Sequence, residues 1–529
     1  MALKKLHFCS LVSASLIMIA CGGGSESSPP TAAPPPSSPP PTSSPPPTQD
    51  GRLPAAVNAA NIDAAMLIDV AGNGILDLIL SGPTGSGATG RDWLLINDGT
   101  GNFELHGTQL PPRYLGADGA TVAFAQGDFN RNGFTDILAV TVDAREGSYY
   151  QTSELHLWLN QGDGSFTDAS AQIANRQLTG WPEWIRVADF DGDGHLDFLI
   201  TSPGNPEQNC SGSAQIFLND STASFVRASV TLQDSMGSYQ DDCLWFDRGM
   251  NTQNERFVGY TLDALPADLN NSGLPDLVAS SLEATWPVFL NRSSPGQLVF
   301  DVVFNGGELR LSPCPDDPEQ QCASLDPFSN AGAGIWKNGA LADINGNGRM
   351  DLVAANPISG FPDRLWPVVI WYGQNDGKFE LYGGAGSDNC LNDPAESGRC
   401  NNTFTSADYP DRVGVQHARQ WLVADFNKDG FEDVLILDHG FDASPFPGRQ
   451  NLLLLGQTNG GMQDGTAEWL SGNSTFTHGG AVGDLTQNGW PDIVKNNYVN
   501  GDMTGQFTQY DNHPKLNLNT GLPPMTAED

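Results

Sequence analysis

The stretch Asp189-Phe-Asp-Gly-Asp-Gly-His-Leu-Asp197 decides the fold of this chain. It sets carboxylates at places one, three, five and nine, and a glycine at place six. The pattern recurs six more times, and every copy keeps the Gly at place six and the Asp at place nine. The other copies begin at Asp69, Asp128, Asp268, Asp343, Asp425 and Asp484. Their starts lie 59 to 82 residues apart, and self-similarity at such intervals is typical of an array of supersecondary units.

Oxygen donors at alternating places are the chemistry of a calcium loop. Ca²⁺ takes about six to eight oxygen ligands, which a tight loop with a glycine at its bend can supply. Short apolar runs at 185–188 and 198–200 flank the quoted copy and indicate β-strands rather than the two helices of the helical calcium hand. The alternative for each copy is a turn without an ion, because Asp, Asn and Gly form turns by themselves.

The predicted calcium ligands are the side chains at places one, three, five and nine. They are Asp69, Asn73, Asp77, Asp128, Asn130, Asn132, Asp136, Asp189, Asp191, Asp193, Asp197, Asp268, Asn270, Ser272, Asp276, Asp343, Asn345, Asn347, Asp351, Asp425, Asn427, Asp429, Asp433, Asp484, Thr486, Asn488 and Asp492. The copy at Asp189 is the richest, with four carboxylates. The copy at Asp69 is the poorest, because Ala71 stands at its third place.

Each copy belongs to a larger unit that also contains a hairpin. Examples are the segments 93–103, 157–166 and 370–379, in which an apolar run leads through a Gly-rich turn to a Phe. Asp-Gly between two such runs is a strong hairpin signal. Each unit therefore reads as four antiparallel strands, the composition of one propeller blade.

With these motifs, the chain resembles the FG-GAP/VCBS repeat family, whose calcium-loop blades also build the head of integrin α chains. The resemblance covers residues 51–529. It implies an all-β fold, a seven-bladed β-propeller of four-stranded antiparallel blades, with Ca²⁺ loops between the first and second strands. From the lengths of the two end segments, we expect the ring to close by an outer strand near residues 50–54 that completes the last blade.

The N-terminus has the features of an export signal and a tether. Residues 1–20 carry two lysines and an apolar stretch too short to span a bilayer. The residues before Cys21 resemble a bacterial lipoprotein box, which implies lipidation of Cys21 and attachment to the outer membrane or cell surface. The alternative is an ordinary cleaved signal with an unmodified Cys21. Residues 21–50 are rich in Pro, Ser and Gly and predict a semi-rigid tether.

Charge and cysteine content narrow the environment and the partners. The net charge of −37 argues against nucleic acid and anionic lipid headgroups as partners. In an exported chain, an even number of cysteines favours disulfides. The six that remain beyond Cys9 and Cys21 fall as near neighbours, which suggests local pairing. They are Cys210 with Cys243, Cys314 with Cys322, and Cys390 with Cys400.

The face opposite the calcium loops is the predicted ligand-binding face, because the long insertions fall there and rigid scaffolds carry binding residues on loops. Tryptophans expected at strand starts on that face are candidate ligand anchors: Trp184, Trp286, Trp336, Trp366 and Trp421. The alternative is that they fill the wedges between blades. We expect a surface-anchored propeller that binds a glycan or a cell-surface protein in adhesion or recognition. The alternative is an extracellular polysaccharide-acting enzyme, a lyase or hydrolase, although no catalytic motif is present.

Overall fold

The computed structural model describes most of the chain after residue 51. The described residues are 52–54, 56–57, 62, 64–84, 88–107, 110–145, 152–178, 182, 184–201, 214–234, 237–241, 261–281, 288–303, 338–355, 366–381, 414–440, 448–458, 460–470, 477–497, 515–521, 523 and 525–527. None of the helices in this part of the chain has the length and apolar character of a membrane span.

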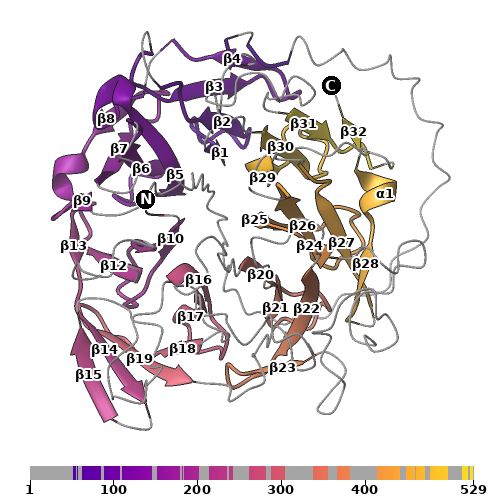
Figure 1. The fold of residues 1–529 in the computed structure, drawn as a ribbon. Coiled ribbons are helices and arrows are strands. Elements are labelled where there is room, and N and C mark those ends of the chain that lie inside the picture. The colour runs from indigo at the N-terminus through magenta and orange to yellow at the C-terminus, as the bar shows by residue number, and fades with distance from the viewer. Residues whose placement is uncertain are drawn as a thin grey trace, which may run out of the picture.

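Seven small antiparallel sheets stand in a ring and form a seven-bladed β-propeller, which confirms the predicted fold (Figure 1). In every blade the strands follow one another in chain order. The first strands are β1 (Ala65–Ile68), β5 (Gly119–Gly127), β10 (Trp184–Ala188), β16 (Thr261–Ala267), β20 (Asn338–Ala342), β25 (Ala418–Ala424) and β29 (Thr477–Gly483). The second strands are β2 (Asp77–Leu80), β6 (Asp136–Asp143), β11 (Asp197–Thr201), β17 (Asp276–Ser281), β21 (Asp351–Ala355), β26 (Asp433–Asp438) and β30 (Asp492–Asn497).

The third and fourth strands complete each blade. The third strands are β3 (Trp93–Asn97), β7 (Ser153–Asn160), β12 (Ala214–Asn219), β18 (Val288–Asn291), β22 (Trp366–Gly373), β27 (Leu452–Gly456) and β31 (Lys515–Leu518). The fourth strands are β4 (Phe103–Leu105), β8 (Phe166–Asp168), β13 (Phe225–Arg227), β19 (Leu298–Val303), β23 (Phe379–Leu381), β28 (Met462–Asp464) and β32 (Thr526–Ala527). Helical structure in the described residues is limited to α1 (Thr466–Trp469) and the 3₁₀ turns η2 (Gly116–Asp118) and η3 (Ser170–Gln172).

The first strands line the centre of the ring and close it. Each of them contacts the first strand of the next blade, and β29 of the last blade contacts β1 of the first. In Figure 1 these seven strands are the ones nearest the middle of the ring. Because the ring is closed, each sheet face is covered by a neighbouring blade. Only the short edges of the sheets are left, as is usual in propellers.

Three blades carry strands beyond the predicted four. In the second blade β9 (Gln177–Leu178) pairs with β7, and in the fifth β24 (Gly414–Val415) pairs with β22. In the fourth blade the hairpin β14 (Val230–Asp234) and β15 (Gly237–Asp241) extends the sheet to six strands, because β14 pairs in parallel with β19.

The predicted closure by residues 50–54 is wrong. The last blade takes its fourth strand, β32, from the C-terminal end of the chain. The chain reverses direction after β31 with a turn at Gly521, whose φ of 76° suits glycine. The C-terminal segment therefore pairs with β31 by itself. The N-terminal residues instead lie along the first blade: the Arg52 carbonyl accepts the N–H of Phe103 at 2.7 Å.

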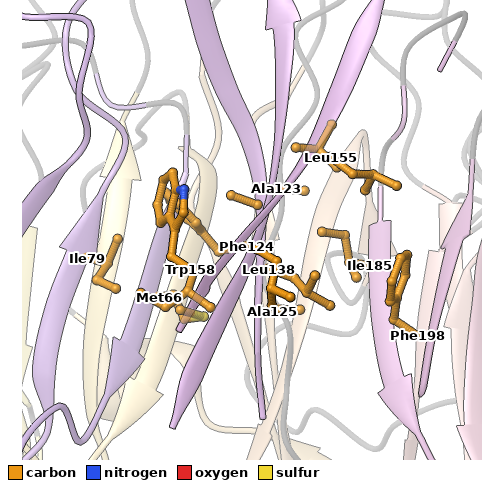
Figure 2. Close-up of a cluster of buried hydrophobic side chains, with 14 of the residues drawn as sticks. Met66, Ile79, Ala123, Phe124, Ala125, Leu138, Leu155, Trp158, Ile185 and Phe198 are labelled. Atoms are coloured by element: carbon orange, nitrogen blue, oxygen red, sulfur yellow. The ribbon is translucent and has the colours of Figure 1, made fainter. Parts of the chain in front are cut away.

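Apolar clusters between blades hold the ring together. The largest spans the first three blades and includes Phe124 and Trp158 in the second blade, with Met66 and Phe198 on either side (Figure 2). Leu53 is buried with the first and last blades in a second cluster. Both faces of each sheet meet a neighbour, so second strands such as β11 are buried along their full length, which explains their continuous apolar sequence.

Candidate metal centre

The repeated nine-residue loops occupy the predicted position in every blade. Each joins a first strand to a second strand, and each is eight residues long before the second strand begins. The ninth-place Asp is the first residue of the second strand in all seven blades. Because the strands are antiparallel, these loops lie on one face of the ring, together with the turns between third and fourth strands. The connections into first strands lie on the opposite face.

The first-place Asp organises the bend of each loop. In six loops its carboxylate accepts the N–H groups of places five and six, and in the third loop it accepts those of Gly192 and Gly194. All these donor–acceptor distances lie between 2.7 and 3.1 Å. The fifth-place oxygen then accepts the N–H of place seven at 2.7 to 3.3 Å.

Two backbone positions in each loop are left-handed. The glycine at place six has φ between 80° and 91°, which explains why every copy keeps it. The residue at place four is left-handed as well, which was not predicted from the sequence. Place four is occupied by Gly72, Arg131, Gly192, Asn271, Gly346, Lys428 and Gln487, with φ between 51° and 73°. Three of these are glycine, and that enrichment is the signal that would have identified the position.

The ninth-place Asp is a buried structural hub as well as a predicted ligand. In the third loop, Asp197 accepts the N–H of Phe190 at 2.9 Å through one oxygen and the N–H of Asn219 at 2.8 Å through the other. The equivalent acceptor bonds to the third strand occur in all seven blades, at 2.6 to 3.0 Å. This carboxylate therefore ties the start of the loop and the end of the third strand to the second strand.

Burial raises the pKa of these ninth-place carboxyls, although the backbone donors oppose the shift. The pKa reaches about 8 at Asp197, about 7 at Asp351 and Asp433, and about 6 at Asp136, Asp276 and Asp492. At Asp77 burial raises the pKa too. Neighbouring first-place carboxylates add to the rise. A divalent cation among these groups would offset both the burial and the repulsion.

An asparagine at the end of the third strand links each of five blades to the blade before it. Asn160 Nδ2 donates to the carbonyl of Val70 in the preceding loop at 2.8 Å, and Asn97 makes the same bond to Leu485 across the ring closure at 2.8 Å. Asn219, Asn291 and Asn519 complete the set, at 2.8 to 2.9 Å. The Leu-Asn strand ending in the sequence was the available signal for these residues.

The fifth and sixth blades have glycine, Gly373 and Gly456, at that position. A side chain there would collide with the backbone oxygens of Met350 and Glu432. Between these two blades a different contact appears: the carboxylate of Glu432, at place eight of the sixth loop, accepts the N–H of Asp343 at 2.5 Å. Burial raises the pKa of Glu432. The sequence reading did not single out this residue.

The third loop gathers its ligands most closely. Ligand atoms of Asp189, Asp191 and Asp197 all lie within 4.8 Å of one another, and they are the only such group among the described residues. The donors are all carboxylate oxygens, which suit a hard cation such as Ca²⁺. Asp191 is 3% exposed, and it also accepts the N–H of Gly296 in the next blade at 2.6 Å.

The other loops bring together fewer acidic ligands. The sixth loop has three carboxylates, Asp425, Asp429 and Asp433, but they do not form a group as close as that of the third loop. The first-place Asp of the first loop accepts the same two N–H groups as in five other loops, and Ala71 stands where a third-place ligand would be. The residues present therefore fit an ion best in the third loop and least well in the first.

The candidate ligand anchors are only partly described. Trp184 and Trp421 are 6% and 8% exposed, and Trp421 packs in the apolar cluster of the fifth and sixth blades. Such burial favours the packing role for these two. The backbone of Trp366 opens β22 and pairs with Val415. Trp286, Trp336, the predicted signal peptide and tether, Cys21 and the six cysteines that are predicted to pair lie outside the described residues.

On the face opposite the loops, buried polar contacts join neighbouring blades. Arg186 lies 4.5 Å from the ring centroid of Trp184 and pairs with Asp263 of the next blade, with its Nε 3.0 Å from Oδ1. Between the first two blades, the fully buried Asp92 accepts the hydroxyl of Thr121 at 2.6 Å and lies 3.4 Å from Arg113. These contacts join side chains of neighbouring blades, which indicates a structural role.

Comparisons with known proteins identify the repeat. A solved structure of a BT0996 RGII complex is 11% identical and covers 74% of this chain and 86% of its own, with a TM-score of 0.29. A Penicillium chrysogenum alpha-L-arabinanase complexed with arabinobiose is 8% identical and covers 71% and 88%, with a TM-score of 0.32. No curated protein matches the chain. The family model of the FG-GAP-like repeat matches residues 69–139, 128–200 and 425–494. These stretches each hold two or more strands of a blade and at least one nine-residue loop, and these parts of the propeller are accordingly similar to FG-GAP-like repeats.

Proposed function

We propose that this chain is a calcium-stabilised recognition propeller that binds a macromolecule, a glycan or a protein, on the face opposite its nine-residue loops. The observation that carries the proposal is a contrast in length between the two faces. All seven loops between first and second strands have eight residues, whereas the connections into first strands range from 12 residues after β28 to 36 residues after β23. One face is uniform and the other varied, which is the division of a scaffold face from a binding face.

The calcium part rests on the chemistry of the loops. Loops of one length bring oxygen donors to one face, and in the third loop three carboxylates lie within 4.8 Å of one another. Empty, such a loop holds like charges close together. Ca²⁺ bound by Asp189, Asp191, Asp193 and Asp197 would supply the missing positive charge and fix the loop.

The cellular setting follows from the N-terminal sequence. We infer lipidation at Cys21, a tether through residue 50, and display of the propeller outside the cytoplasm. A net charge of −37 fits a partner that is not itself a polyanion. Local disulfides among the six cysteines would brace the long connections of the binding face, since they all fall in those connections.

A binding screen tests the recognition proposal. Residues 51–529, produced under oxidising conditions with calcium, are applied to an array of polysaccharides and extracellular proteins. Saturable binding that leaves the ligand intact supports recognition. Release of new reducing ends or unsaturated products from a polysaccharide would identify an enzyme instead, and an absence of binding to every arrayed ligand under folded conditions counts against the proposal.

Matched variants locate the binding face. Trp366→Ala alters the start of a third strand on the proposed face, and Asp163→Ala alters a turn on the loop face, where Asp163 accepts a hydrogen bond from Ser165 at 3.0 Å. We expect the first to weaken binding with little change in melting temperature and the second to leave binding unchanged. Loss of binding in Asp163→Ala alone would move the site to the loop face.

A further inference from the structure

Four of the seven loops carry an Asn-Gly pair at places five and six. The pairs are Asn73-Gly74, Asn132-Gly133, Asn347-Gly348 and Asn488-Gly489, and all eight residues are exposed. A backbone nitrogen that follows Asn can attack the side-chain amide carbon, and glycine hinders this attack least because it has no Cβ. The same two places in the third and sixth loops hold Asp193-Gly194 and Asp429-Gly430, where no side-chain amide exists.

The hydrogen bonds of the loop hold the groups that this reaction uses. The N–H of each glycine, the attacking group, donates to the first-place carboxylate at 2.7 to 2.9 Å. The side-chain oxygen of each asparagine, which gains negative charge during the attack, accepts the N–H of place seven at 2.7 to 2.9 Å. A carboxylate that accepts the attacking N–H and a donor on the developing oxyanion are the two aids that acyl transfer requires.

We propose that Asn73, Asn132, Asn347 and Asn488 are sites of spontaneous deamidation. The glycine nitrogen forms a bond to Cγ of the asparagine and loses its proton, and the Cγ–Nδ2 bond breaks with release of ammonia. Water then opens the resulting five-membered imide. Cleavage of its bond to Cγ gives aspartate, and cleavage of its bond to the main-chain carbonyl carbon gives isoaspartate. One water is consumed and one ammonia is released, with no oxidant or reductant.

The two products have opposite consequences for the loop. Aspartate at place five reproduces the residue found in the third and sixth loops. In the loops at Asp128 and Asp343 it increases the number of carboxylates at the ligand places from two to three. Isoaspartate inserts a methylene into the main chain, which displaces the left-handed glycine that the bend requires. The reaction therefore either strengthens a cation site or destroys it.

Calcium occupancy controls the rate, and this second step rests on the proposed calcium function. The first-place carboxylate and the fifth-place oxygen are both predicted ligands. An ion between them withdraws the carboxylate from the glycine N–H and holds the asparagine side chain in one orientation. We expect deamidation to be about tenfold slower in calcium than in chelator, because the carboxylate and the asparagine oxygen would then be ligands of the ion and would no longer assist the attack.

Peptide mass spectrometry tests the sites directly. The folded protein is incubated in mildly alkaline buffer with chelator, digested, and searched for the mass gain that accompanies exchange of an amide for a carboxyl. We expect the gain at all four asparagines and none at Asn338-Gly339, which lies within β20. Asn132→Ser, which copies the natural Ser272 of the fourth loop, abolishes the gain in its own peptide and leaves the other three. Unchanged peptides at all four sites, while short synthetic peptides of the same sequence deamidate, would overturn the proposal.

A calcium arm separates this inference from the proposed function. Calcium binding to the same sample is measured by titration calorimetry. If calcium binds and the four rates fall, the control by occupancy stands. If calcium binds and the rates do not change, control by occupancy is wrong although the calcium function holds. If calcium does not bind, the calcium function itself fails, and the chelator arm alone decides the deamidation sites.

Discussion

The first and third loops have the same backbone frame but different ligands. In both, the first-place Asp holds the bend and the ninth-place Asp, Asp77 or Asp197, accepts the N–H of place two and the N–H of the third strand. The third place, by contrast, is Ala71 in one loop and the buried Asp191 in the other. The loop at Ala71 keeps its shape without a third-place ligand. Two of the recurring carboxylates therefore build the loop, and the remaining places equip it for an ion.

Removal of calcium gives the largest expected effect, because it acts on all equipped loops together. Each loop that binds calcium would stabilise the native state by about 2.7 kcal/mol when free calcium is 100 times its dissociation constant. Excess chelator should lower the melting temperature by many degrees, and added calcium should restore it, as followed by calorimetry. An identical melt in chelator and in calcium would show that the third loop differs from the first in sequence only.

Loss of a ninth-place Asp should be the next largest effect, and it should be the same in both loops when no ion is bound. Asp77→Ala and Asp197→Ala each leave two backbone N–H groups without their acceptor, at about 1–3 kcal/mol for each buried donor. Urea unfolding in chelator measures the loss. In calcium, Asp197→Ala should cost more than Asp77→Ala, and a harmless Asp77→Ala would contradict the structural role of the hub.

Acidification should stabilise the protein in chelator and so reduce the difference between its melting temperatures in chelator and in calcium. Asp197 has a pKa of about 8 in the folded chain, above the ordinary value of 3.8, so the folded state holds a proton that the unfolded state releases between these limits. Its contribution is fully present below pH 3.8 and is lost as pH rises through about 8. Melting temperatures in chelator should therefore rise as pH falls from 8 towards 5. Asp197→Asn should reduce that slope, and the slope should shrink in calcium, where the ion replaces the proton.

Exchange of single ligands should give the smallest effect and the sharpest comparison. Ala71→Asp supplies the first loop with its missing carboxylate, and Asp193→Asn removes one charge from the third loop while it keeps the side-chain oxygen. We expect calcium affinity to rise in the first and fall in the second, each by about tenfold, or about 1.4 kcal/mol. In chelator both variants should unfold near the parent. Equal behaviour with and without calcium would mean that place three and place five act only as turn residues.

The sequence predicts the architecture well because the repeat is local. A fixed Gly at place six and a fixed Asp at place nine mark each loop, and the apolar runs beside them can only be the flanking strands. The loop position between first and second strands is confirmed in all seven blades. The left-handed fourth place was missed because Arg131 and Lys428 occupy it as well as glycine, and backbone conformation is not visible in such residues.

Contacts between distant residues were harder to predict. The closure by residues 50–54 failed because segment lengths cannot decide which of two ends supplies a short strand, and β32 has only two residues. The role of Asn160 depends on a carbonyl 90 residues earlier, and that of Glu432 on an N–H 89 residues earlier. Pairings at such separations follow from the ring itself, which the repeat predicts only in outline.

The hydrogen bond from Asn97 to Leu485 bears on whether the fold depends on the position of the chain termini. A bond of the same kind, from an asparagine Nδ2 to a main-chain carbonyl of the preceding loop, joins Asn160 to Val70 within the continuous chain. The junction between the last and first blades therefore resembles the junction between the first and second blades in this bond. Since the last and first blades are joined in the same way as blades that are continuous in sequence, the fold does not depend on a chain break at this junction. A circularly permuted chain, opened in a connection on the face opposite the loops and joined from residue 527 to residue 52, should rebuild the same propeller from a different beginning.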